Sequence, residues 1–231
     1  MLKAISLTKT YESQLALDNL NLEIKPGEVY CLLGQNGAGK TTTINLFLGF
    51  IAPDSGQAFI NGEQVSAGDN PTRKYIAYIP EVVMLYSSFT AIENLDYFSR
   101  LAGFKYAKKT LAVFLDQCGL QREAHGKRLK NFSKGMRQKV GIAIALAKNA
   151  EAILMDEPTS GLDPKAINEF TATVKTLAGN GKAILMATHD IFNAVNVGTT
   201  IGIMKQGKLV HNLKAADINA SNLQKLYLET I

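Results

Sequence analysis

Continuous apolar runs divide the chain at intervals that predict buried β-strands. Four such runs stand out: Val29–Leu33, Ile76–Ile79, Ile153–Met155 and Ala183–Ala187. An unbroken apolar run of this length is typical of a strand buried on both faces of a parallel sheet. Three of the four runs end near a Gly, Pro, Asp or His, as expected where a strand passes into a loop. The pattern therefore predicts a mainly parallel sheet.

Helical spacing follows these strands, while the N-terminal third has a different pattern. Helices are predicted over Lys40–Gly49, Lys134–Lys148, Pro164–Ala178 and Asp190–Val195. Antiparallel strands joined by turns such as Asn61-Gly62 are indicated by spaced apolar residues: Leu17, Leu20, Leu22 and Ile24, and later Ala58 and Ile60. The predicted fold class is α/β, with a mainly parallel sheet and an N-terminal antiparallel β layer.

Composition restricts the class of protein further. With 231 residues, 46% hydrophobic and 19% charged, the chain fits one globular domain over residues 1–231. Its longest uncharged apolar stretch, Val140–Ala147, is far shorter than the about 20 residues of a membrane-spanning helix, and the first residues lack the pattern of a secretory signal. Two cysteines without metal-binding spacing exclude a disulfide framework and a zinc finger. We expect a protein of the reducing cytoplasm.

Charge is concentrated in one segment. Between Arg100 and Lys139 there are 11 basic and 2 acidic residues, although the whole chain carries only +5. The segment has helical patterns and no strong strand, so we expect a helical subdomain inserted at approximately residues 85–148, with a basic surface. Such a surface is either simply solvated or close to an anionic partner, and both interpretations stay open.

The strongest local motif is a glycine-rich loop between a predicted strand and a predicted helix. Residues 34–41 read Gly-Gln-Asn-Gly-Ala-Gly-Lys-Thr, the phosphate-binding pattern GxxxxGK[ST]. Backbone N–H groups and the helix N-terminus favour phosphate, Lys40 meets the β- and γ-phosphates, and the hydroxyl of Thr41 binds Mg²⁺. The predicted phosphate contacts are Gly34, Asn36, Gly37, Ala38, Gly39, Lys40, Thr41 and Thr42. A structural turn would need neither Lys40 nor Thr41.

Two further strands end in polar side chains. Asp156 and Glu157 follow one apolar run, and His189 follows another. Because ligands of α/β folds bind at the carboxyl edge of the sheet, we expect Asp156 to hold Mg²⁺ and Glu157 to polarise the attacking water as general base. His189 is expected to contact the γ-phosphate, although a lone histidine is more often structural.

These motifs, in this order, resemble the ATP-binding cassette (ABC) ATPase family over almost the whole chain. The deciding element is residues 131–138, Asn-Phe-Ser-Lys-Gly-Met-Arg-Gln, which is similar to the ABC signature in a variant found in export systems. The resemblance implies a P-loop NTPase core with ATP and Mg²⁺ as cofactors. It further implies that Ser133 and Gly135 contact the ATP of a second subunit, that Tyr11 stacks on adenine, that Asp163 lies in the turn crossing the dimer interface, and that His189 is the switch histidine.

Two positions depart from the usual family pattern. Glu81 stands where the family usually has a glutamine, and Lys134 replaces the first glycine of the signature. Glu81 could still bind Mg²⁺ or orient water, but its charge lies near the γ-phosphate, which is electrostatically unfavourable. The ammonium of Lys134 would offset part of that charge. We interpret both residues as features of an export-like branch that retains hydrolysis.

The resemblance implies the ATPase subunit of an ABC transporter, paired with a second ATPase subunit, in the simplest case as a homodimer. It would lie on the cytoplasmic side of the cell membrane, bound peripherally through a separate integral membrane permease that is received by residues 81–100. The alternative is a soluble ABC ATPase that acts on nucleic acid or the ribosome. Only the basic segment favours it, and the chain lacks the second cassette or long coiled coil usual in such proteins. A non-catalytic regulator is disfavoured by Lys40 together with Glu157.

Overall fold

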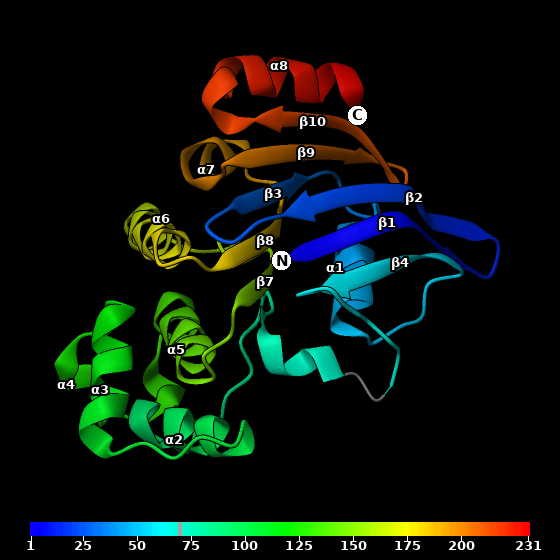
Figure 1. The fold of residues 1–231 in the computed structure, drawn as a ribbon. Coiled ribbons are helices and arrows are strands. Elements are labelled where there is room, and N and C mark those ends of the chain that lie inside the picture. Colours follow the sequence, from blue (N-terminus) through cyan, green and yellow to red (C-terminus); the bar gives the residue numbers. More distant parts are fainter. Residues whose placement is uncertain (69–70) are drawn as a thin grey trace.

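Two β-sheets and the helices around them make up the fold, which we describe from a computed structural model covering residues 1–68 and 71–231 (Figure 1). The six-stranded sheet has the order β10-β9-β3-β8-β7-β6. Its members are β3 (Val29–Leu33), β6 (Ile76–Ile79), β7 (Ala152–Asp156), β8 (Ala183–Thr188), β9 (Thr200–Lys205) and β10 (Lys208–Lys214). All neighbours run parallel except β9 and β10. The predicted parallel sheet is confirmed, with an antiparallel edge strand.

The second sheet is antiparallel and is built from the N-terminal part of the chain. Its order is β2-β1-β4-β5, formed by β1 (Leu2–Tyr11), β2 (Gln14–Ile24), β4 (Ser55–Ile60) and β5 (Glu63–Gln64). Asn61 and Gly62, with φ of 53° and 80°, make the turn between β4 and β5. Positive φ at both central residues is the conformation that Asn-Gly favours in a two-residue hairpin. The predicted antiparallel layer is therefore confirmed.

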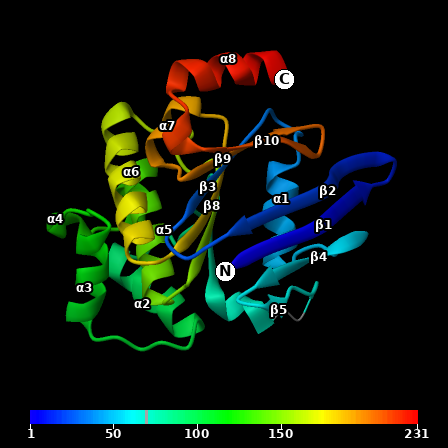
Figure 2. The ribbon, with the colours of Figure 1, turned by 45° about the horizontal axis from the view of Figure 1, so that its top comes forward.

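Helices cover the six-stranded sheet unequally on its two faces. Figure 2 shows α5 and α6 on one side of β3 and β8, with α1 and the antiparallel sheet on the other side. The helices are α1 (Lys40–Leu48), α2 (Ala91–Leu101), α3 (Lys108–Gln117), α4 (Arg122–His125), α5 (Lys134–Ala147), α6 (Pro164–Gly179), α7 (Ile191–Val197) and α8 (Ala220–Thr230). Short 3₁₀ turns span Pro71–Tyr75, Leu129–Asn131 and Ala215–Asp217.

Alternate side chains of the central strands enter two separate cores. On β3, Val29, Cys31 and Leu33 pack with the helices α5 and α6, whereas Tyr30 and Leu32 pack with α1 and the antiparallel sheet. The same division holds on β7 and β8. Successive side chains of a strand point to opposite faces of the sheet. A strand that contributes to a core on each face therefore needs an unbroken apolar run. Helix α1 is thereby buried between two sheets.

The helices α2–α5 lie between β6 and β7, in the segment where the sequence predicts a helical insertion. A capping box at Thr90 and Glu93 starts α2, and Ser133 starts α5 by accepting a hydrogen bond from the Met136 N–H at 3.3 Å. Within residues 1–68 and 71–231, no helix combines the length and the apolar character that crossing a membrane requires.

Candidate active site

The glycine-rich loop connects β3 to α1 and forms one wall of a cleft of about 450 Å³. The ends of β7 and β1 and the start of β2 also line the cleft. Ten of the predicted site residues line it: Tyr11, Asn36, Gly37, Gly39, Lys40, Thr41, Thr42, Glu81, Asp156 and Glu157. The cleft thus gathers residues that are separated by up to 146 positions in the sequence, as expected at the carboxyl edge of a parallel sheet.

Two glycines are required by the course of the loop. Gly39, with φ of 105°, occupies the N-cap position of α1, and a Cβ there would lie 2.6 Å from the Ala16 carbonyl oxygen. At Gly34, a Cβ would lie 2.8 Å from both the Cβ of Ala38 and the Met204 carbonyl oxygen. In the part of the chain that the structure describes, no side chain caps the N-terminus of α1, so its N–H groups are available to an anion.

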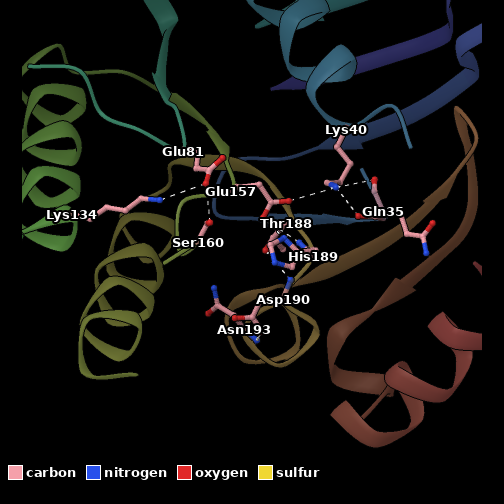
Figure 3. Close-up of polar contacts among 11 residues, drawn as sticks. Gln35, Lys40, Glu81, Lys134, Glu157, Ser160, Thr188, His189, Asp190 and Asn193 are labelled. Carbon is pink, nitrogen blue, oxygen red and sulfur yellow. Dashed lines mark hydrogen bonds and ion pairs between the residues drawn. The ribbon is translucent and has the colours of Figure 1, made fainter. Parts of the chain in front are cut away.

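Lys40 is folded back onto the loop. Its ammonium donates to the Gly34 carbonyl at 2.6 Å and to the Gln35 carbonyl at 3.2 Å, and lies 3.5 Å from Oε1 of Glu157 (Figure 3). The residue is only 5% exposed. A buried ammonium is costly unless it is paired, and these three oxygens pair it.

Asp156 lies at the end of β7 with its carboxylate beside Thr41. Burial raises the pKa of this carboxyl above the usual range, and the charges of Glu157 and Glu81 act in the same direction. A hydrogen bond with Thr41 and the charge of Lys40 oppose the increase in pKa. A hydroxyl and a crowded carboxylate are hard oxygen donors, so this corner of the cleft suits a small divalent cation.

Glu157 and His189 are brought into direct contact. Oε2 of Glu157 lies 2.8 Å from Nδ1 of His189 and accepts a hydrogen bond from the His189 N–H at 3.3 Å. The pairing follows from the register of β7 and β8, in which Asp156 lies opposite Ala187. Glu157 also has φ of 45°, a left-handed conformation that is unfavourable for a non-glycine residue. Its Oε1 makes no hydrogen bond among the described residues and faces Lys40.

Glu81 is tied to two other segments. Its Oε1 accepts a hydrogen bond from the Ser160 hydroxyl at 2.8 Å and lies 3.6 Å from the Lys134 ammonium (Figure 3). The two residues that depart from the usual family pattern therefore face each other, as charge compensation predicts. Glu81 lines the cleft, but this carboxylate oxygen is directed toward Ser160 and Lys134.

Ser133 and Gly135 do not line the cleft that contains Lys40. They lie in a separate hollow of about 250 Å³, which Asp163 also lines. Tyr11 does line the cleft and is 43% exposed, with the Lys9 ammonium 5.7 Å from its ring centroid. Gly34 and Ala38 belong to the loop, and His189 reaches the site through Glu157, without lining the cleft.

Several residues of the site escaped the sequence-based prediction. Gln14, Ala16 and Gln35 line the cleft, Ser160 binds Glu81, and Gln138 binds the segment after Glu157. Gln35 could have been predicted from the sequence, since it lies inside the loop motif. The signal for Gln138 is its place four residues after Lys134, which puts both on one face of the helix.

Comparison with known proteins identifies similar chains. A family model described as "ABC transporter" matches residues 17–160. The chain is 37% identical over 230 residues to the bacitracin transport ATP-binding protein BcrA of Bacillus licheniformis, covering 99% of this chain and 74% of that protein. It is 32% identical over 227 residues to the lantibiotic transport ATP-binding protein SrtF of Streptococcus pyogenes, covering 98% and 96%.

Solved structures give the same result. The ATP-binding subunit of an ABC transporter superimposes with a TM-score of 0.86 at 31% identity, covering 99% of this chain and 98% of that one. A dimeric post-hydrolysis state of the ATP-binding cassette MJ0796, bound to ADP and Pi, superimposes with a TM-score of 0.82 at 29% identity, covering 93% and 99%. The P-loop fold predicted from the sequence is confirmed.

Proposed function

The chain belongs to the ABC transporter family as an ATP-binding, ATP-hydrolysing subunit, and we propose that it drives export through a separate membrane permease. The observation that carries ATP hydrolysis is the cluster of Lys40, Glu157 and His189 at the cleft, and export is supported by the relatives. BcrA, SrtF and the Nod factor export ATP-binding protein I of Cupriavidus metallidurans, to which the chain is 32% identical over 225 residues, are named for transport or export. These relatives support transport and offer no support for action on nucleic acid.

Phosphate binding is assigned to the loop and to Lys40. The ammonium of Lys40 already lies against the oxygens of Gly34, Gln35 and Glu157, so a bound triphosphate offers it stronger acceptors in nearly the same place. Gly37, Gly39 and the uncapped N-terminus of α1 supply N–H groups. Tyr11, at the rim of the cleft, offers an aromatic face to adenine.

The residues present fit Mg²⁺. Thr41 supplies a hydroxyl and Asp156 a carboxylate. Burial disfavours the ionised form of Asp156, and a divalent cation would stabilise that form. Mg²⁺ is usually held by one or two protein oxygens together with substrate phosphates and water, which this donor set allows. When bound, the ion neutralises charge that develops on the transferred phosphoryl group. Glu81 is the second carboxylate of the cleft that could approach it.

Glu157 is assigned as the general base and His189 as its orienting partner. Oε2 is engaged by the ring and the N–H of His189, which fixes the direction of the carboxylate. Among residues 1–68 and 71–231, Oε1 has no hydrogen-bond partner, and it faces Lys40 in the cleft, where a water beside the γ-phosphate would lie. Displacement of Lys40 from Glu157 by the triphosphate would leave Oε1 available to accept the proton of that water.

A second subunit is required to complete the site. Ser133, Gly135 and Asp163 lie together in a hollow away from the cleft of Lys40. A two-fold dimer would bring the hollow of one chain against the cleft of the other, so that each ATP lies between two subunits. The hydroxyl of Ser133 and the N-terminus of α5 would then contact the γ-phosphate of the partner's nucleotide.

The surface that receives the permease is assigned to the exposed apolar segment after Glu81. Val82, Met84 and Tyr86 are 58%, 80% and 47% exposed. The Tyr86 ring packs against Phe89 and Tyr97, with centroids 5.2 and 5.1 Å apart. Exposed apolar side chains gathered in this way mark an interaction surface. Binding there would hold the chain peripherally on the cytoplasmic side of the membrane.

One experiment tests both halves of the proposal. The tagged chain is purified from detergent-solubilised membranes of its native host, and Glu157→Gln is compared with the unaltered chain and with Met84→Glu. We expect Glu157→Gln to bind ATP and to co-purify with the permease, while turnover falls by about 10²–10⁴-fold. Met84→Glu should lose the permease and keep basal turnover. Co-purification of ribosomes or nucleic acid in place of the permease would favour the alternative function.

A further inference from the structure

Gln138, a buried residue of α5, has no assigned part in the ATP reaction, yet it touches the segment that carries Glu157. The residue is 2% exposed, and its Nε2 donates to the Pro158 carbonyl at 2.9 Å. Within residues 1–68 and 71–231, no other hydrogen bond reaches that carbonyl, and Oε1 of Gln138 has no partner. Burying an unpaired amide oxygen is unfavourable, so a buried glutamine here costs stability on that side of the amide. The favourable contribution of this polar side chain is its hydrogen bond to Pro158.

One face of α5 contacts the ends of two neighbouring strands. Lys134 and Gln138 are four residues apart and therefore lie on the same side of the helix. Lys134 faces Glu81, just beyond β6, and Gln138 binds Pro158, just beyond β7. The strands β6 and β7 are paired in parallel, so their ends lie side by side. The contact of Lys134 is exposed and screened by water, whereas that of Gln138 is buried.

Pro158 directly follows the strained residue Glu157. The Glu157 N–H donates to the Ala187 carbonyl at 2.9 Å, and the Ser160 N–H donates to the Glu157 carbonyl at 3.2 Å. A positive φ at a non-glycine residue persists only where its surroundings determine it strongly. Three hydrogen bonds hold the backbone around Glu157. One is made with Ala187 of β8, one lies within the turn, and the third comes from Gln138 on the helical insertion.

We propose that Gln138 is a positioning residue, whose amide fixes the Pro158 carbonyl and thereby the direction in which Glu157 presents its carboxylate. This proposal rests on the role of Glu157 as general base. Movement of α5 would then be transmitted to the base through one buried hydrogen bond, so that turnover depends on where the helical insertion sits.

The test is a double-mutant cycle between Gln138 and Glu157. Gln138→Leu has similar volume and removes the unpaired oxygen, but it leaves the buried Pro158 carbonyl without its donor, so we expect the fold to persist with a lower thermal midpoint. We expect kcat to fall by about 10–100-fold, the scale of a small misplacement of a catalytic group, while KM and ATP binding stay unchanged. In the Glu157→Gln background the same substitution should cause no further loss.

Thr171→Val is the matched control. The Thr171 hydroxyl is also buried and donates to Oδ1 of Asn193 at 2.8 Å, but that bond joins α6 to α7 and does not touch the segment after Glu157. We expect Thr171→Val to lower the thermal midpoint with kcat unchanged. Loss of kcat in proportion to loss of thermal stability in both variants would reduce Gln138 to a structural residue and overturn the proposal.

Other outcomes separate this proposal from the one it rests on. Full turnover by Gln138→Leu while Glu157→Gln is inactive overturns the positioning role and leaves the general base intact. Independent, multiplicative losses in the double variant show that Gln138 does not act through Glu157, which also overturns it. Normal turnover by Glu157→Gln removes the general base and this inference with it.

Discussion

Asp156 is 9% exposed, and burial raises the pKa of its carboxyl, with Glu157 and Glu81 adding to the increase. A carboxyl whose pKa is higher in the folded than in the unfolded chain makes folding less favourable once it ionises. Its contribution to stability therefore declines as the pH rises through the titration range of aspartate. The residue that best suits a divalent cation is thus unfavourable for the fold in the absence of one.

We predict that Asp156→Asn stabilises the nucleotide-free protein while abolishing turnover. The amide keeps an acceptor for Thr41 and removes the buried charge. At neutral pH, calorimetry should show a thermal midpoint raised by about 2–4 °C, the shift that corresponds to roughly 1 kcal/mol in a chain of this size. The difference should vanish in acid, where both side chains are neutral. A lower midpoint at neutral pH would contradict this.

Which residues belong to the candidate site was largely predictable from the sequence, but which of these side chains contact one another was not. The loop motif identifies Lys40 and Thr41, and a strand end identifies Asp156 and Glu157. The contact between Glu157 and His189 depends on the register of β7 against β8, which no local pattern encodes. The contact of Lys40 with the Gly34 carbonyl likewise depends on the course of the loop, which brings the carbonyls of Gly34 and Gln35 within reach of its ammonium.

At the scale of elements, unbroken apolar runs predicted their strands, and interrupted patterns were missed. The bounds of β3 and β6 agree with the predicted runs, whereas β9 and β10 were not predicted. Strand β9 has four buried residues, but Gly202 interrupts its short apolar pattern. Strand β10 is an edge strand in which exposed and partly buried residues alternate, and its polar residues weaken the signal. Helix α4 has four residues, too few for a helical period to be visible.

Helix α5 and the segment after β6 are joined by the exposed pair of Lys134 and Glu81, which supports a prediction about charge. Glu81→Gln keeps an acceptor for Ser160 and loses the attraction to Lys134. Because the two side chains are 32% and 52% exposed, we expect the free energy of unfolding to change by less than about 0.5 kcal/mol. ATPase activity should be retained, with a lower KM for ATP, because the substitution removes a negative charge that lies near the γ-phosphate.

A titration of ATPase activity with ATP at saturating Mg²⁺ measures this effect, and Lys134→Ala is the control. It removes the same attraction but leaves the carboxylate of Glu81 in the cleft wall, so its KM for ATP should not fall. Complete loss of turnover in Glu81→Gln would show that the carboxylate is essential as an acid or a ligand.

For the whole molecule, the separation of Ser133 from the cleft of Lys40 predicts complementation between two inactive proteins. Lys40→Ala and Ser133→Arg each damage both sites of their own homodimer and should be nearly inactive. In a mixed dimer, both changes fall in one site, and the other is built from unaltered residues. Mixing should therefore restore measurable phosphate release, provided that one intact site suffices.

Exchange into mixed dimers is verified with differently tagged chains, and mixing two samples of the same variant is the control. If mixed dimers form and release no phosphate, the composite site is wrong or both sites must act together. Formation of an ATP-dependent dimer by Glu157→Gln on a sizing column separates these two outcomes.

The division of the central strands between two cores also limits how the length of this chain can change in evolution. One inserted residue within β7 would move each following side chain to the opposite face of the sheet. A residue such as Leu154 would then point into the core that now holds Met155, and the reverse. We predict that a single-residue insertion scan tolerates additions around Gly103 or Gly126, which lie between helices and are not part of a sheet, and rejects them throughout β3, β7 and β8. In alignments of relatives, insertions and deletions should accordingly fall in the loops. The lengths of the central strands should stay constant while the lengths of the loops vary.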